Sequence, residues 1–222
     1  MNKQRILFEI IAACGALTAV LLLKKIHLYI YFWEFNVLVL LTIVFSIIGD
    51  LNSRQLALSL RNLGRGLKLS VIWTIIVFPL YVCFFYIYYT VIGEYSFSVK
   101  LPTEIKIIRE ISTQVVLIAF PEELFFRGYL MNRFSMLLGL EDKLGNKSEA
   151  GFFKRLLPNL FAALFFAITH IIYHGNIVHA AVFFPALLFG YLREKTDSIF
   201  YPVAMHAACN LLYFFLRGCV GM

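Results

Sequence analysis

The sequence predicts an all-α, polytopic membrane helical bundle of about seven transmembrane helices with one amphipathic helix in the membrane interface. Of its 222 residues, 61% are hydrophobic and only 15% are charged, whereas a soluble domain carries about 25% charged residues. Aromatic residues are dense, with 23 Phe and 12 Tyr, as in helices that face lipid and its interface. Seven apolar stretches follow one another along the chain, most of them long enough to cross a bilayer.

The positive charge of the chain is better explained by membrane topology than by nucleic-acid binding. The net charge is +7, but the basic residues cluster in particular loops, as the positive-inside rule requires. If seven helices cross the membrane, roughly twice as many basic residues lie on the side that holds the N-terminus as on the opposite side. This predicts a cytoplasmic N-terminus and an external C-terminus. The four cysteines show no CxxC spacing, so we expect them to form neither a zinc site nor a disulfide framework.

The N-terminal half contains three predicted spans. Residues 6–23 form the first, residues 28–48 the second and residues 69–92 the third. Glu9 and Glu34 lie near the ends of the first two spans, where we expect their side chains to reach water by snorkelling.

Residues 51–68 are predicted to form the amphipathic helix. At 100° per residue, its leucines fall within about 60° of one another and its basic residues fall on the opposite side. Such a helix lies in the interface with its basic face toward lipid headgroups. The leucines are Leu56, Leu60, Leu63 and Leu67, and the basic residues are Arg54, Arg61, Arg65 and Lys68.

The C-terminal half contains four further predicted spans. The segment at residues 177–192 is short, so a re-entrant segment is an alternative there. We find no internal repeat and interpret residues 1–222 as a single transmembrane domain with a motif-bearing core at about 113–216. The four spans are residues 113–133, 156–173, 177–192 and 199–216.

Three charged residues lie inside the fourth span: Glu122, Glu123 and Arg127. Each costs about 2.5–3.5 kcal/mol at the centre of a bilayer, and the neighbouring apolar side chains return only about 3–5 kcal/mol in total. The rest of the chain must therefore shield this stretch, which is a functional-site candidate by default. Glu123 and Arg127 are four residues apart and should pair on one helix face, whereas Glu122 points about 100° away. Pro121 interrupts the helical hydrogen bonds beside them.

Polar residues in two later spans supply groups that could act together with Glu122. His170 lies in the fifth span, and His206 and Asn210 are four apart in the seventh, so they share a face. A buried carboxylate beside an imidazole can take a proton from water. A second imidazole and an amide can donate hydrogen bonds to a developing oxyanion. Together these groups are what the hydrolysis of a carbonyl compound requires.

Three motifs thus occur in order on apolar segments: Glu-Glu-x-x-x-Arg at 122–127, Phe-x-x-x-His at 166–170 and His-x-x-x-Asn at 206–210. In this order they resemble the CPBP family. That family comprises the CAAX prenyl endopeptidases and bacteriocin-processing proteins, which are intramembrane glutamic proteases. The resemblance covers about residues 113–216.

The resemblance implies an endopeptidase that cleaves a membrane-associated peptide without a metal or another cofactor. The first glutamate and the histidine of the second motif would activate the water, and the His-x-x-x-Asn pair would stabilise the oxyanion. The second glutamate and the arginine would hold the geometry of the site, with that glutamate sharing in the acid–base work. The expected catalytic residues are Glu122, Glu123, Arg127, His170, His206 and Asn210.

Three other interpretations use the same features. Glu122, Glu123, His170 and His206 could ligate zinc, although the HExxH spacing is absent. A non-enzymatic immunity or scaffold protein is a second interpretation, although it has no need to bury such charges. A proton-coupled transporter is a third, although transporters often show repeated halves.

We expect membrane lipid and a peptide or protein substrate with a membrane-associated segment as partners, and no nucleic acid. The substrate could be a prenylated C-terminus, a peptide leader or a C-terminal sorting tail. The expected location is a prokaryotic plasma membrane, in which the protein is a multi-pass integral protein. The oligomeric state is not predicted.

Overall fold

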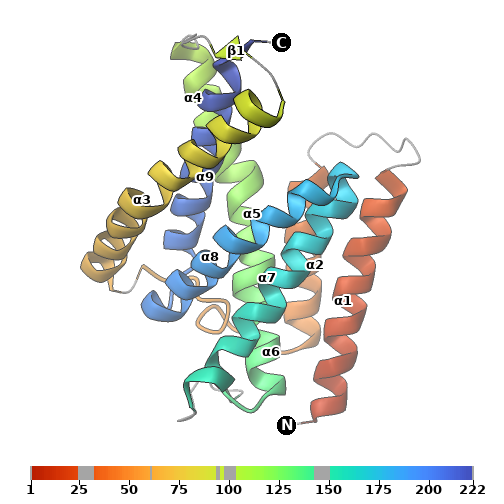
Figure 1. Ribbon diagram of the computed structural model, residues 1–222. Coiled ribbons are helices and arrows are strands. Elements are labelled where there is room, and N and C mark those ends of the chain that lie inside the picture. The colour runs from red at the N-terminus through yellow and green to blue at the C-terminus, as the bar shows by residue number, and fades with distance from the viewer. Residues whose placement is uncertain are drawn as a thin grey trace.

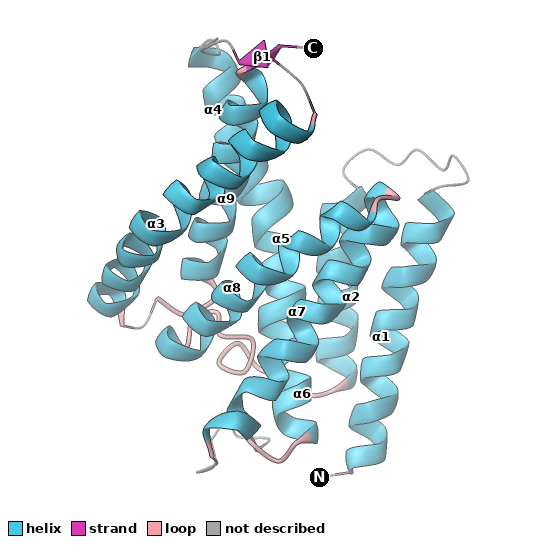
Figure 2. Cartoon of the chain, viewed as in Figure 1, coloured by secondary structure: helices cyan, strands magenta, loops and turns pink. Residues whose placement is uncertain are grey.

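The computed structural model describes residues 2–24, 33–60, 62–93, 96–97, 104–142 and 151–221. The described chain is helical almost throughout, as Figure 2 shows, and the all-α prediction is confirmed. The exception is a short antiparallel ladder that joins β1 (Ser96–Phe97) to β2 (Val220–Gly221).

The N-terminal half supplies three long helices. They are α1 (Lys3–Lys24), α2 (Trp33–Ile48) and α3 (Leu63–Tyr86), and α3 continues into a π-helical turn, η1 (Ile87–Ile92). Helices α1 and α2 pack against each other, whereas α3 packs against α8 and α9 on the other side of the bundle (Figure 1). The first residues of the second predicted span, 28–32, lie outside the described part of the chain.

The C-terminal half begins with a single helical run in which α-helical and π-helical turns alternate. Its parts are α4 (Glu104–Ser112), η2 (Thr113–Ala119), α5 (Phe120–Glu123), η3 (Leu124–Leu130) and α6 (Met131–Leu137). After the loop come α7 (Phe152–His174), the 3₁₀-helical η4 (Ile177–Val182), α8 (Phe183–Thr196) and α9 (Phe200–Gly218).

Four helices among the described residues are long and apolar enough to cross a membrane. They are α1, α3 with η1, α7, and η4 with α8. The fourth includes the segment for which a re-entrant form was an alternative. Apolar side chains on α3, such as those of Ile75 and Phe84, are 67% and 71% exposed, as expected of a surface that faces lipid. The protein is therefore an integral membrane protein, and a count of seven spans stays a prediction.

Residues 51–68 do not form one amphipathic helix, so that prediction is wrong. Residues 51–60 form turns, and α3 begins only at Leu63. Asp50, Ala57 and Asn62 have positive φ angles of 51°, 54° and 56°, which a right-handed helix cannot accommodate. Leu56 is buried in the core instead of facing lipid. Arg61 lies outside the described residues.

Hydrogen bonds tie this turn segment to the end of α8 and to the loop that follows it. The Ile199 amide donates to the Ala57 carbonyl at 3.0 Å, and Arg193 Nη2 donates to the Gln55 carbonyl at 3.2 Å. A Cβ atom on Gly128 would lie 3.0 Å from the Leu56 carbonyl oxygen, so η3 meets this segment at a residue without a side chain. The helical periodicity of the leucines was therefore coincidental, because long-range contacts determine their positions.

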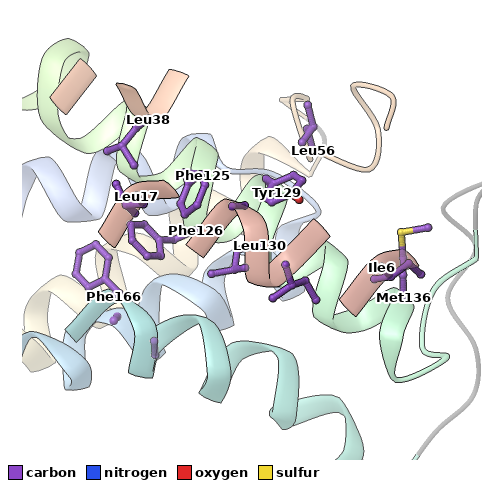
Figure 3. Packing of buried hydrophobic residues seen from close by; sticks show 14 of the residues in the cluster. Ile6, Leu17, Leu38, Leu56, Phe125, Phe126, Tyr129, Leu130, Met136 and Phe166 are labelled. Carbon is purple, nitrogen blue, oxygen red and sulfur yellow. The ribbon is translucent and has the colours of Figure 1, made fainter. Parts of the chain in front are cut away.

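The core surrounds the stretch that carries the charged motif. Phe125, Phe126, Tyr129 and Leu130 of η3 are buried at its centre, between α1, α2 and α7 (Figure 3). Residues from α1, α2, α6 and α7 and from the turn segment complete this cluster, including Ile6, Leu17, Leu38, Leu56, Met136 and Phe166. The remainder of the chain thus shields the charged stretch, as its cost in lipid predicted.

Glu9 does not snorkel to water, so that prediction is also wrong. Its side chain is buried, with Oε2 2.7 Å from Nη2 of Arg133 on α6. Its other oxygen lies 3.0 Å from Nε of Arg5, one turn earlier in α1. Arg133 is buried as well and supplies a counter-charge. The predicted span 113–133 ends at this arginine, but no such role was predicted for it. The side chain of Glu34 lies outside the described part of the chain.

Candidate active site

Pro121 lies between the two π-helical turns of the motif-bearing run. It has no amide hydrogen to donate to the preceding turn, and the run is π-helical both before and after the short α5. π-helical turns inside α-helices occur frequently at functional sites. Here they flank the α-helical turn that carries two adjacent glutamates, Glu122 and Glu123.

Glu123 and Arg127 form a fully buried ion pair. Arg127 Nη1 donates to Glu123 Oε1 at 2.9 Å, and both side chains are 0% exposed. Arg127 Nη2 donates to the Ala186 carbonyl of α8 at 3.0 Å. The guanidinium carbon lies 4.6 Å from the ring centre of Phe166, which adds a cation–π contact. The pair expected from the spacing is present, and it anchors this helix to its neighbours.

His206 is held by the same glutamate. Its Nδ1 lies 2.9 Å from Glu123 Oε1, and its ring stacks on Phe189 with the centres 5.0 Å apart. Because an ionised carboxylate only accepts hydrogen bonds, Nδ1 carries a hydrogen. Nε2 is then the nitrogen that faces Glu122, with 3.8 Å between Nε2 and Glu122 Oε2.

His170 is oriented in a similar way by the backbone. Its Nδ1 lies 2.9 Å from the carbonyl oxygen of Phe166, one turn earlier in α7. A carbonyl oxygen only accepts, so Nδ1 donates and Nε2 is left to face the site. The distance from Nε2 to Glu122 Oε2 is 4.0 Å. Phe166 therefore orients His170 through its backbone and packs against both histidine rings through its side chain.

Glu122 is thus the point at which three helices converge. Its Oε2 faces one imidazole from α7 and one from α9. The side chains of Glu122 and His170 are 14% and 21% exposed, whereas that of His206 is 5% exposed. The group is enclosed, although two of its three side chains keep some exposure. Such an arrangement can bind a water molecule or a polar substrate atom between a carboxylate and two imidazoles.

Asn210 lies one turn beyond His206 on α9 and makes a different contact. Its Nδ2 donates to Gln114 Oε1 at 2.8 Å. Gln114 Nε2 in turn donates to Glu110 Oε1 at 2.7 Å. Sequence reasoning missed Gln114 and Glu110, although their spacing of four residues ahead of the motif was visible. It also missed the carbonyl of Ala186, which no side-chain pattern could indicate.

The zinc interpretation fits these contacts less well. Within the part of the chain that the structure describes, no group of three or more His, Cys, Asp or Glu side chains is arranged to hold a metal ion. Glu123 Oε1 already accepts hydrogen bonds from Arg127 and His206, so only its Oε2 would remain to act as a ligand.

Residues 105–212 match the protein family described as type II CAAX prenyl endopeptidase Rce1-like. This region of the chain is Rce1-like. The match runs from α4 into α9, contains all six expected catalytic residues and confirms the family predicted from the three motifs. The coarse assignment of the chain is therefore a membrane protease, a hydrolase. No curated protein and no solved structure matches the chain.

Proposed function

We propose that the protein is a metal-independent intramembrane endopeptidase in which Glu122 is the general base. The observation that carries the proposal is the set of distances from Glu122 Oε2 to the two histidines, 4.0 Å to His170 Nε2 and 3.8 Å to His206 Nε2. These distances are too long for direct hydrogen bonds and suit one water molecule that contacts all three groups.

The first chemical step uses Glu122 and His170. The Phe166 carbonyl holds the hydrogen of His170 on Nδ1, so in the neutral ring Nε2 accepts a hydrogen bond from the water. Glu122 takes the second hydrogen of the water as a proton while the water oxygen attacks the carbonyl carbon of the scissile peptide bond. The carbonyl becomes an oxyanion, and Glu122 becomes a neutral acid.

The second step uses the donors on α9. In the imidazolium form, which enters the reaction already carrying both protons, His206 donates Nδ1–H to Glu123 and Nε2–H to the oxyanion. Asn210 supplies an amide hydrogen from the next turn. Collapse of the oxyanion breaks the C–N bond, and the proton on Glu122 passes to the leaving amine. Glu123 is then a positioning residue whose charge is balanced by Arg127.

The proposed substrate is a membrane-associated peptide or C-terminal tail. The matching family is described as a prenyl endopeptidase, which supports a prenylated C-terminus as the first substrate to test. A peptide leader and a sorting tail with its own membrane helix are the other two classes to include. The enclosed position of Glu122 between helices supports substrates that approach through the membrane.

The experiment that tests the proposal compares membrane peptides from cells that make the wild-type protein or the Glu122→Gln variant. We expect a fragment that is present only with the wild type, and it would identify both substrate and cleavage site. Glu194→Gln is the matched control, because it makes the same substitution at a distance from the site. Glu194 lies two turns along α8 from Ala186, whose carbonyl binds Arg127. Identical fragments from wild type and Glu122→Gln would overturn the proposal.

A chelation experiment tests the metal-independent mechanism separately. Cleavage of the identified substrate by purified protein should continue in the presence of a strong chelator. Loss of activity that zinc restores would replace this mechanism with the zinc alternative. Neither result depends on which of the three substrate classes is correct.

A further inference from the structure

We infer that Gln114, held in place by Glu110, is a positioning residue that sets the orientation of the Asn210 amide. The inference rests on the proposed function, in which Asn210 donates to the oxyanion. Two hydrogen bonds in series support it: Asn210 Nδ2 to Gln114 Oε1 at 2.8 Å and Gln114 Nε2 to Glu110 Oε1 at 2.7 Å. The three residues form a polar line from α4 through η2 to α9.

The direction of these hydrogen bonds follows from the chemistry of the first group in the line. An ionised carboxylate has no hydrogen to donate, so Glu110 must receive a hydrogen from Gln114. The amide nitrogen of Gln114 is therefore directed at Glu110, and its oxygen is directed at Asn210. Asn210 must then present its own amide nitrogen to Gln114. Glu110 thus determines which end of two successive amides faces which neighbour.

This orientation matters because the two ends of an asparagine amide have opposite effects on an oxyanion. The nitrogen carries two hydrogens, so one remains for the substrate when the other binds Gln114. A reversed amide would present a carbonyl oxygen, which repels negative charge. The active orientation of Asn210 is consequently selected before a substrate binds, as electrostatic preorganisation requires.

The backbone under this line is held by close packing. Ala119 of η2 belongs to one buried apolar cluster with Val203 and Ala207 of α9. Small side chains at these positions let the two helices approach closely. Gln114 and Asn210 are therefore carried by helices whose relative position is determined by other contacts, and their hydrogen bond is available to orient the amide.

Gln114→Leu tests the inference, because leucine keeps much of the side-chain volume and removes both amide groups. The probe is an internally quenched peptide with a farnesylated cysteine three residues from its C-terminus. We expect kcat to fall roughly 10-fold with KM unchanged, as for loss of part of an oxyanion interaction. In an Asn210→Ala background, Gln114→Leu should cause no further loss. Ser112→Ala, on the adjacent turn, is the control and should keep wild-type activity.

A second pair of variants leaves the contact between η2 and α9 untouched. Glu110→Gln keeps an oxygen that can accept from Gln114 but can also present its own amide nitrogen, so it should lower kcat only in part. Glu110→Leu removes the acceptor and should lower kcat as far as Gln114→Leu does. Three results would each overturn the inference. The first is equal activity of the two Glu110 variants, and the second is a wild-type kcat for Gln114→Leu. The third is that Gln114→Leu lowers kcat as much in the Asn210→Ala background as it does in the wild type. If Glu122→Gln also cleaves the probe at the wild-type rate, the proposed function fails as well, which distinguishes the two failures.

Discussion

At the scale of single residues, Glu122 and Glu123 have different surroundings although they are adjacent in the chain. Glu123 binds a guanidinium and an imidazole through one oxygen and is completely buried. Glu122 is partly exposed, and its nearest imidazole nitrogens are 3.8 and 4.0 Å away. Glu123 is therefore engaged by neighbouring helices, and Glu122 is the carboxylate to which our proposal assigns the chemistry.

Glu123→Gln should therefore mainly lower stability, whereas Glu122→Gln should mainly abolish activity. Glu123→Gln leaves the buried charge of Arg127 uncompensated, so we expect it to lower the free energy of unfolding by about 3–5 kcal/mol. Glu122→Gln should change that free energy by less than about 1 kcal/mol while abolishing cleavage. Unfolding of both variants in detergent, followed together with peptide cleavage, measures the two effects.

Equal loss of stability in the two variants would contradict this division of roles. Glu194→Gln again serves as the control, since it removes one negative charge at a distance from the site. The same measurements on Arg127→Met would show whether the buried positive charge itself is the source of the instability.

The sequence was informative about residues whose partners lie one helical turn away. The Glu123–Arg127 pair follows from a spacing of four, and Glu122 follows as the glutamate left over. His170 and His206 were placed near Glu122 only by the order of the motifs and the family resemblance. The roles of Phe166, Gln114 and the Ala186 carbonyl depend on contacts between helices, which a single sequence does not contain.

At the scale of secondary-structure elements, glycine determines how closely α3 approaches α9. A Cβ atom on Gly66 would lie 2.2 Å from the ring of Tyr201, which is buried on α9. At Gly64, two residues earlier, no atom lies within 4 Å of the corresponding position. The two glycines look alike in the sequence, and the structure shows that one of them makes close packing possible.

Gly66→Ala and Gly64→Ala should therefore differ in the sign of their effects. Gly66→Ala forces a rigid ring to move and should lower the free energy of unfolding by about 1–3 kcal/mol. Gly64→Ala should raise it by as much as about 1 kcal/mol, since alanine restricts the unfolded chain and favours helix. Thermal unfolding in detergent compares the two, and a shift of equal size and sign in both would contradict the close approach.

Elements were predicted best where apolar residues are continuous and worst where turns carry apolar residues. The long helices α1, α7 and α9 begin and end within a few residues of the predicted spans. The prediction of a helix failed at the turn segment 51–60, because the leucines there match a helical period by chance. There, Asn52 and Gln55 each donate a backbone amide to the other's side-chain oxygen at 3.0 Å, and these two bonds close a turn instead.

At the scale of the whole molecule, a buried ion pair links the N-terminal half to the Rce1-like region. Glu9 on α1 lies outside the matched residues, whereas Arg133 on α6 lies inside them. A Cβ atom on Gly49, after α2, would lie 1.2 Å from Arg133 Nη2, so the guanidinium occupies the space beside that glycine. Three parts of the chain therefore meet at one buried charge.

Glu9→Gln should weaken the whole bundle rather than α1 alone. Loss of the negative charge leaves Arg133 buried without its main counter-charge, which costs about 3–5 kcal/mol. We expect a single cooperative unfolding transition at lower temperature and reduced cleavage in proportion to the folded fraction. If Glu9→Gln unfolds at the same temperature as the wild type, apolar contacts alone hold α1 in the bundle.

The spacing of these ion pairs also bears on how the chain enters the membrane during synthesis. Glu123 has Arg127 four residues later, and Glu9 has Arg5 four residues earlier. Each acid can therefore be neutralised within its own helix before any other helix is present. Glu9 then gains its second partner only when α6 arrives, about 120 residues later in the order of translation. Each of these two acids can thus enter lipid beside a counter-charge of its own helix, and the interhelical pairs form when the bundle assembles.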